Sequence, residues 1–289
     1  RFYQYDLETA SDVDLPLLYT AITVEEGADD FRQGDEIILA PLENKADDSG
    51  SLFKFNASYQ FTADVMGYVT LSEGFRIGGA NGVGACNPDS SGDTQEVCAL
   101  PNEQIYAPDT TTNYELGFKS TWLKNKFHFN MALFNVDWDD AQVTGNTENG
   151  QQTILVNAGK ANSKGVEMMS RAIFTDELSA YATYAFTKAE LTEDVPELFD
   201  DSDALDGDRL PGSPEHQFSL GLKYSTEVMG DKLLDVTYGI TAQSDVYSKI
   251  GLHESGEVIS GYALSNVSAS LSDEDWTVTL YVDNLFDKY

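Results

Sequence analysis

The sequence predicts an all-β protein whose antiparallel strands form an up-and-down transmembrane barrel. Three observations favour this fold class: apolar and polar residues alternate with a period of two, many alternating segments exceed ten residues, and short connections interleave with long ones. A strand in a globular protein has about 5 to 6 residues, whereas a tilted strand that crosses a bilayer needs about 9 to 11.

The alternation is clearest between Phe53 and Phe61, where every odd position is apolar or aromatic and every even position is polar. We expect the even side chains to face the lumen and the odd ones to face lipid. Aromatic residues near strand ends, such as Tyr59, Trp122 and Trp276, are typical of the girdles at the membrane–water interfaces. About eleven strands are predicted, at 1–8, 51–61, 66–76, 111–122, 126–138, 161–175, 178–190, 213–226, 232–247, 261–272 and 276–286.

The connections between these strands fall into two strictly interleaved classes. Such interleaving is typical of a barrel with short periplasmic turns and long extracellular loops. A soluble antiparallel sheet also alternates, but it has no reason to sort its loops by side, and no propeller-like repeat is present. The short turns lie near 62–65, 123–125, 175–177, 226–231 and 272–275, and the long connections near 9–50, 77–110, 139–160, 191–212 and 248–260.

Charge and hydropathy exclude several classes of protein. The chain has 17 Lys and Arg against 49 Asp and Glu, which gives a formal net charge of −32. So acidic a chain repels nucleic acid, and its strand periodicity argues against disorder. No apolar run approaches the ~18 residues of a transmembrane helix. Arg1 opens directly into strand-like sequence without a signal peptide, so we expect the natural start of an exported protein to lie upstream.

The two cysteines, Cys86 and Cys98, lie in one polar stretch that reads as a loop, GGANGVGACNPDSSGDTQEVCALPNEQ at 78–104. Two cysteines in one exposed loop suggest a local disulfide and an oxidising compartment. Such a bridge would stabilise the fold by roughly 3 kcal/mol on the chain-entropy model. Two free thiols are the alternative, and a metal site is less favoured because no third Cys or nearby His completes a ligand set.

Five segments, taken in order, resemble the C-terminal half of the barrel of TonB-dependent outer-membrane receptors. The resemblance implies about half of a barrel of roughly 22 strands with a plugged lumen, in the outer membrane of a Gram-negative bacterium. The segments are YVTLSEGFRIGGAN at 68–81, IYAPDTTTNYELGFKSTW at 105–122, NAGKANSKGVEM at 157–168, LPGSPEHQFSLGLKY at 210–224 and YVDNLFDKY at 281–289.

The sequence departs from the family pattern at both ends. Neither the plug domain nor the energy-coupling segment is visible, and eleven strands are one short of the even number that closed bacterial barrels have. We therefore expect residues 1–289 to be a partial barrel domain that lacks the plug and the last strand.

The residues give little sign of chemistry. We find no nucleophile elbow, metalloprotease helix or phosphate loop, and the histidines His128, His216 and His253 lie on separate predicted elements. The sequence therefore indicates no enzyme, no catalytic residue and no cofactor.

The candidate ligand contacts lie at the outer end of the predicted barrel. Arg76 could meet an anionic ligand there, and the alternative is an ion pair with Glu115 or Glu73. Asn81 and Tyr106 are further candidates in the following loop.

Calcium is a separate possibility in the acidic stretch 193–208, whose spacing does not fit an EF-hand. A solvated loop is the alternative to a calcium site. The candidate ligands are Asp200, Asp201, Asp203, Asp206 and Asp208.

The resemblance implies an active importer of a scarce nutrient, foremost an iron–siderophore or another metal chelate. Its expected partners are the TonB–ExbB–ExbD system, reached through the absent N-terminal part, together with the ligand and the lipid membrane. An oligosaccharide or cobalamin importer is the alternative within the same architecture. A passive porin and an outer-membrane barrel enzyme are the alternatives of other classes.

Overall fold

The computed structural model describes residues 2–11, 14–16, 36–38, 42–83, 99–147, 153–157, 159–199, 202–252 and 256–288. Within these residues, no helix is both long enough and apolar enough to cross a bilayer. The helical element assigned in the described residues is the short 3-10 turn η1 (Ile250–Leu252).

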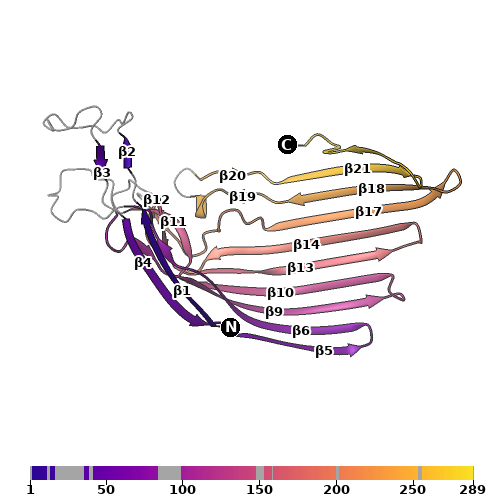
Figure 1. Cartoon of the computed structure of the whole chain (residues 1–289). Coiled ribbons are helices and arrows are strands. Elements are labelled where there is room, and N and C mark those ends of the chain that lie inside the picture. Colours follow the sequence, from indigo (N-terminus) through magenta and orange to yellow (C-terminus); the bar gives the residue numbers. More distant parts are fainter. Residues whose placement is uncertain are drawn as a thin grey trace.

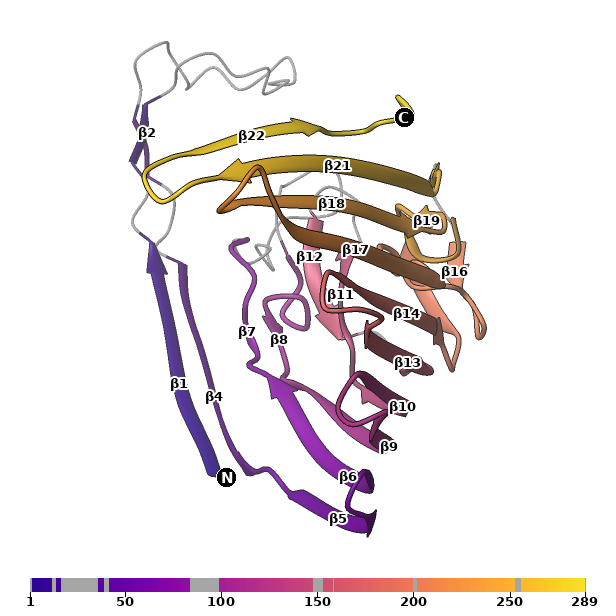
Figure 2. The ribbon, with the colours of Figure 1, turned by 90° about the vertical axis from the view of Figure 1, so that its right-hand side faces the viewer.

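A single curved, ten-stranded antiparallel sheet dominates the molecule (Figures 1 and 2). Each strand pairs with its neighbours in chain order, and β5 and β22 form the two edges. Short turns gather at one end of the sheet and long connections at the other, which confirms the predicted up-and-down arrangement. The strands are β5 (Lys54–Thr62), β6 (Val65–Arg76), β9 (Asp109–Trp122), β10 (Phe127–Asp139), β13 (Ala161–Ile173), β14 (Leu178–Leu191), β17 (His216–Val228), β18 (Lys232–Gln243), β21 (Tyr262–Ser272) and β22 (Thr277–Val282).

The long connections carry small two-stranded sheets of their own. They give the loop end a folded layer rather than a set of separate loops. These strands are β7 (Gly79–Ala80) with β8 (Ile105–Tyr106), β11 (Gln142–Asn146) with β12 (Thr153–Asn157), β15 (Val195–Phe199) with β16 (Ser202–Ala204), and β19 (Val246–Tyr247) with β20 (Val258–Ile259).

The prediction for the N-terminal segment was wrong in its partner. The strand expected at 1–8 is β1 (Phe2–Ser11), which pairs with β4 (Leu42–Ser51) in a sheet separate from the ten-stranded one. The connection expected at 9–50 therefore contains β4, and also the short pair β2 (Asp14–Pro16) and β3 (Glu36–Ile38). The sequence of β4, LENKADDSGS, is polar on both faces, so it carries no period-two signal.

Two strand ends also differ from the prediction. The strand expected to reach 247 ends at Gln243, and Val246–Tyr247 forms the separate strand β19. The strand expected to reach 286 ends at Val282, because Asn284 takes a left-handed φ of 47°. The Asn284 side-chain nitrogen donates to the Lys288 carbonyl, and the Asn284 side-chain oxygen accepts from the Lys288 backbone nitrogen. These two bonds close a local turn.

Strand register separates two chemically different faces. One row of directly paired residues contains no charged side chain: Tyr59, Gly67, Phe118, Met131, Met168, Tyr184, Phe218, Ala242 and Ala263. The next row, on the opposite face, contains Ser58, Tyr68, Gly117, Ala132, Glu167, Ala185, Gln217, Gln243 and Tyr262.

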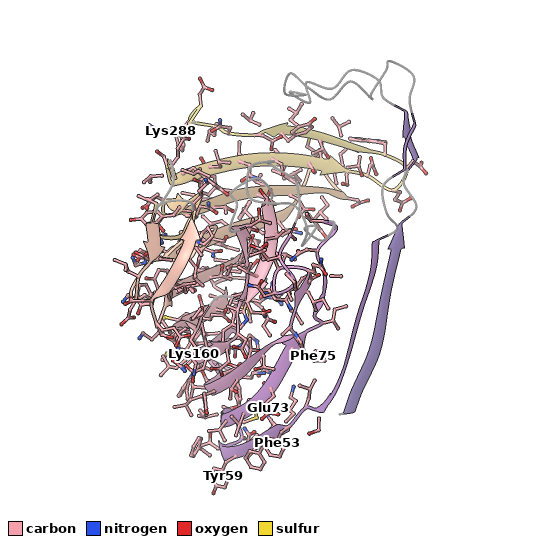
Figure 3. All side chains as sticks on the ribbon, turned by 90° about the vertical axis from the view of Figure 1, so that its left-hand side faces the viewer. Phe53, Tyr59, Glu73, Phe75, Lys160 and Lys288 are labelled. Carbon is pink, nitrogen blue, oxygen red and sulfur yellow. The ribbon has the colours of Figure 1, made fainter. Side chains whose placement is uncertain are left out.

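The polar face is the concave one. Trp138, Ala161 and Leu191 share it, and they pack against loop residues such as Val143 of β11. Figure 2 shows β7, β8, β11 and β12 over the hollow side of the sheet. The apolar face is convex and exposed: Tyr59 is 68% exposed and lies at the margin of the molecule in Figure 3. An exposed apolar face of this extent is what a surface in contact with lipid requires.

Candidate ligand-binding site at the loop end

Asp109, the first residue of β9, is the centre of a polar cluster where the strands meet the loops. Its side chain is 1% exposed, and it lies directly opposite Arg76, the last residue of β6. The Arg76 Nε donates to both carboxylate oxygens, at 3.2 and 2.9 Å, and a terminal guanidinium nitrogen contacts the same carboxylate. The Trp138 indole nitrogen donates at 2.8 Å and the Gln142 backbone nitrogen at 3.0 Å. Several charge-assisted bonds therefore compensate the buried carboxylate.

Side-chain amides extend this cluster across two connections, 77–108 and 140–160. Gln142 Nε2 donates to the carbonyls of Ile77 and Ala107, at 2.9 and 3.0 Å. Asn157 Nδ2 donates to the carbonyls of Ala107 and Asp140, both at 2.9 Å, and its oxygen accepts from the Ala107 nitrogen. We call this cluster the loop base, and it consists of Arg76, Asp109, Trp138, Gln142 and Asn157.

Arg76 is the most exposed member of the loop base. About half of its side chain is exposed, at 51%. Its guanidinium carbon lies 4.7 Å from the centre of the Trp138 ring, and a terminal nitrogen donates to the Gln142 carbonyl at 2.9 Å. These contacts hold the guanidinium in one orientation. Because Asp109 compensates its charge, Arg76 offers a ligand oriented donors more than net positive charge.

Asn81 and Tyr106 lie in the connection that follows Arg76, but they differ in what they offer. Asn81 is buried, and its amide pairs with the backbone: the nitrogen donates to Glu103 and Leu155 carbonyls at 2.8 Å, and the oxygen accepts from the Leu155 nitrogen at 2.9 Å. Tyr106 pairs with Gly79, and a Cβ on that glycine would lie 2.4 Å from the Tyr106 hydroxyl oxygen. Asn81 thus links two loops. Tyr106 lies against Gly79, where the space does not admit a side chain.

A small apolar core joins the other connections. Its buried residues come from the ends of β13 and β14 and from the connections 192–215 and 244–261, and residues of 140–160 pack against them. Three connections therefore share one core and form a single layer. The buried members are Ala161, Leu191, Ala204 and Ile250, packed against Trp138, Val143, Val156, Val195 and Leu210.

A second arginine ties two of these connections together. Arg209 donates to the Asp245 carboxylate at 3.1 Å and to the carbonyls of Asp245 and Ser213 at 2.6 and 2.8 Å. Its guanidinium carbon lies 4.8 Å from the centre of the Tyr247 ring. This arrangement repeats the arginine–aspartate–aromatic grouping of the loop base at the other side of the loop layer.

Below the loops, the concave wall is hollowed by a groove of about 440 Å³. Tyr68, Lys119 and Glu167 are among the residues that line it. The Tyr68 hydroxyl bonds the Glu115 carboxylate at 2.5 Å, and its ring lies across Gly117, where a Cβ would be 2.0 Å from ring carbons. The ring therefore lies flat on the wall instead of filling the groove.

The remaining predicted site residues stay untested. Cys86, Cys98, Asp200, Asp201 and His253 lie outside the described residues, as does the side chain of Asp203. The Asp206 nitrogen donates to Asp194, and the Asp208 carboxylate accepts from the Leu205 nitrogen, both at 2.8 Å. In the described part of the chain, no three His, Cys, Asp or Glu side chains converge as metal ligands. His128 and His216 bond Thr121 and Tyr184 respectively, on different strand pairs.

Sequence reasoning named the wrong acid as the partner of Arg76. Glu115 bonds Tyr68, and Glu73 bonds the backbone nitrogen of Phe53 at 2.8 Å. Alternation excludes Glu73, because residues 73 and 76 lie on opposite faces of β6. Asp109 becomes the predicted partner once β6 and β9 are paired in register. Trp138, Gln142, Asn157 and Arg209 were also missed, and they carry no local signal because their partners lie in other connections.

Comparison with known proteins identifies the family that has this architecture. The family model "TonB dependent receptor-like, beta-barrel" matches residues 19–285. The ferric-pyoverdine M114 receptor of a Pseudomonas strain is 30% identical over 184 residues, which are 61% of this chain and 21% of that receptor. The pesticin receptor of Yersinia pestis is 23% identical over 251 residues, 85% of this chain and 32% of that receptor. The chain thus spans well under half the length of these curated relatives.

Solved structures show the same fold. The ferric yersiniabactin uptake receptor FyuA from Yersinia pestis superposes with a TM-score of 0.67 at 22% identity, over 87% of this chain and 35% of that one. The ferric-catecholate import receptor Fiu from Escherichia coli K12, in its closed form, gives 0.66 at 20% identity, over 99% of this chain and 37% of that one. Together with the family match, these likenesses show that the chain belongs to the TonB-dependent receptors, as part of their β-barrel.

Proposed function

We propose that this chain is part of an outer-membrane receptor that imports an iron–siderophore or another metal chelate, energised through TonB. Support comes from relatives whose names specify ferric-pyoverdine, yersiniabactin and catecholate receptors. In this proposal the TonB–ExbB–ExbD system acts through a part of the protein outside this chain. In this proposal the barrel serves transport and carries out no catalysis.

The loop base is the observation that carries the proposal. It holds an exposed arginine in a fixed orientation at the concave, loop-bearing end of the sheet, where an external ligand arrives first. A fixed guanidinium suits the oxygen-rich periphery of a chelate, because it presents its donors without a further entropic cost.

The charge of the chain narrows the class of chelate. A net charge of −32 disfavours long-range attraction of strongly anionic chelates, although salt screens the effect beyond about 8 Å. Arg76 does not reverse this field, since Asp109 compensates it. Neutral or cationic chelates are therefore the preferred ligands. Neutral oligosaccharides satisfy the same condition, and a sugar or cobalamin importer remains the second candidate.

Growth of a deletion strain on single nutrients tests the ligand class. We expect loss of growth on at least one ferric chelate as sole iron source, restored by the full-length receptor. The Arg76→Gln receptor should restore growth poorly, whereas the Lys223→Gln receptor, altered lower on the concave wall, should restore it fully. Loss of growth on an oligosaccharide, with every iron source still used, would replace the iron proposal by the sugar one.

A further inference from the structure

A pair of glycines hollows the concave wall at a second place, away from the loops. Gly221 of β17 and Gly239 of β18 lie directly opposite each other on neighbouring strands (Figure 1). A Cβ on Gly221 would lie 2.1 Å from a carbon of the Tyr181 ring. A Cβ on Gly239 would lie 2.9 Å from the side-chain oxygen of Asn266. Here the wall has a groove of about 640 Å³, a volume typical of small-molecule sites. We call it the glycine groove.

The lining of the glycine groove combines an aromatic face with neutral hydroxyl groups. Tyr181 is 53% exposed, although its ring lies across Gly221. Thr237 and Ser268, which also line the groove, share a hydrogen bond of 2.7 Å between their hydroxyl oxygens. Such a pair uses one of its two O–H donors, so the second donor and the remaining lone pairs are left for a ligand. The groove therefore offers a flat ring and uncharged hydrogen-bonding groups side by side.

The charges that border the glycine groove balance one another. Arg171 of β13, the direct partner of Tyr181, lines one margin, and Asp283, which follows β22, lines the other. Lys223 also borders the groove, but its ammonium pairs with Asp235 at 3.0 Å. In the described part of the chain, the Arg171 guanidinium has no acid within ion-pair distance, so its donors are left for a ligand. The groove is close to neutral overall, although the chain has a net charge of −32.

The glycine groove is separate from the loop base. Ala161 of β13 pairs with Trp138 of the loop base, and Arg171 lies ten residues farther along the same strand, close to its turn end. At about 3.3 Å per residue, Arg171 is about 33 Å from the loop base along the wall. A small ligand cannot contact both places at once, so the groove is a distinct site on the same concave face.

We propose that the glycine groove is a second contact site for the imported chelate, occupied after the chelate leaves the loop base. The inference rests on the proposed function and specifies its ligand as a neutral chelate with oxygen atoms at its periphery. Arg171 and the free hydroxyls donate to those oxygens, and the Tyr181 ring packs against apolar parts of the chelate. Passage through a pore requires sites that bind well enough to be entered and weakly enough to be left. Neutral hydroxyls and a single guanidinium meet this condition, because their bonds to a ligand replace bonds to water at little net gain.

Uptake and surface binding, measured separately, test the inference. The probe is the radiolabelled ferric chelate that restores growth in the deletion-strain experiment, given to cells that carry the full-length receptor. Arg171→Gln removes the guanidinium donors, and Ser268→Phe fills the groove. Each should lower the maximal uptake rate about ten-fold and leave the binding of chelate to de-energised cells unchanged. Ser58→Phe is the matched control, because it places the same ring on the concave face of β5, outside the groove. It should change neither measurement.

The outcomes distinguish this inference from the proposed function. If the unaltered receptor binds no ferric chelate, the proposed function fails and the role of the groove fails with it. Normal surface binding with equal uptake by Arg171→Gln and the unaltered receptor overturns the role of the groove alone. Uptake by Ser58→Phe as slow as that by Ser268→Phe also overturns it, because general narrowing of the lumen then explains the loss.

Mobility on unheated gels shows whether each variant folds. If Ser268→Phe does not fold, the two substitutions of the exposed Arg171 decide the question. Arg171→Lys keeps a charged donor, so it should take up the chelate several-fold faster than Arg171→Gln. Equal uptake by these two variants, both as fast as the unaltered receptor, would exclude Arg171 from the path of the chelate.

Discussion

Removal of the Asp109 charge tests whether the loop base holds the loops together. In Asp109→Asn, one amide oxygen has to replace a carboxylate that accepts from Arg76, Trp138 and Gln142. The amide nitrogen also turns a donor toward one of these donors. A hydrogen bond to a charged group contributes about 1.5 to 3 kcal/mol. The ion pair adds little because half of Arg76 is exposed. We expect the local stability of the two loops to fall by about 2 to 3 kcal/mol.

Hydrogen exchange of the full-length receptor measures this loss where it occurs. The amides of Gln142 and Leu155 are bonded within the affected assembly, to Asp109 and Asn81. Their exchange should accelerate by about 30- to 140-fold, as the free-energy change requires. Exchange in the middle of the strands should not change. Glu73→Gln is the control, because it removes a charge from the other face of β6, three residues before Arg76, and it should leave both amides unchanged. Unchanged exchange at both amides in Asp109→Asn would refute the role assigned to the loop base.

Three further predictions follow from the wall and the loops. Gly117→Ala should cost about 1 to 3 kcal/mol of unfolding free energy by overpacking a tyrosine ring, measured by urea unfolding in lipid vesicles, and an unchanged midpoint would contradict the close contact. Arg at Ala57 should cost about 2 to 4 kcal/mol in the same assay and Arg at Ser58 much less, and equal effects would reject the assignment of the faces. Cys86 and Cys98 should appear as one linked peptide in non-reducing mass mapping, and two alkylatable thiols in the native protein would disprove the bridge.

Period-two alternation was enough to locate the ten strands of the wall among the eleven predicted, because the middle of each strand has one largely apolar face. The interleaved loop lengths then predicted its pairing order. The same signal failed at β1, whose apolar positions resemble those of a membrane strand although its partner is β4. Strand character depends on local alternation, but a pairing partner is a property of the whole chain.

The candidate site was less accessible to prediction. Arg76 was identified from its place at the end of a strand, but its partner required the register of β6 and β9. Gln142 and Asn157 donate to backbone carbonyls that are distant in the sequence. Every residue has such a carbonyl, so the residue type of the acceptor gives no sign of the bond. A loop layer held by side chain-to-backbone bonds thus leaves almost no trace in the pattern of residue types.

The shared core beneath the loops has a mechanical consequence. Leu191 is buried by residues from three connections, so no one of them can swing outward while the other two keep their places without exposing apolar surface. Exposing a side chain the size of Leu191 or Ile250 costs about 1.5 to 3 kcal/mol each. Small displacements of one connection are therefore transmitted to its neighbours. A molecule that binds to any one of these three connections therefore acts on all three, which move together or not at all.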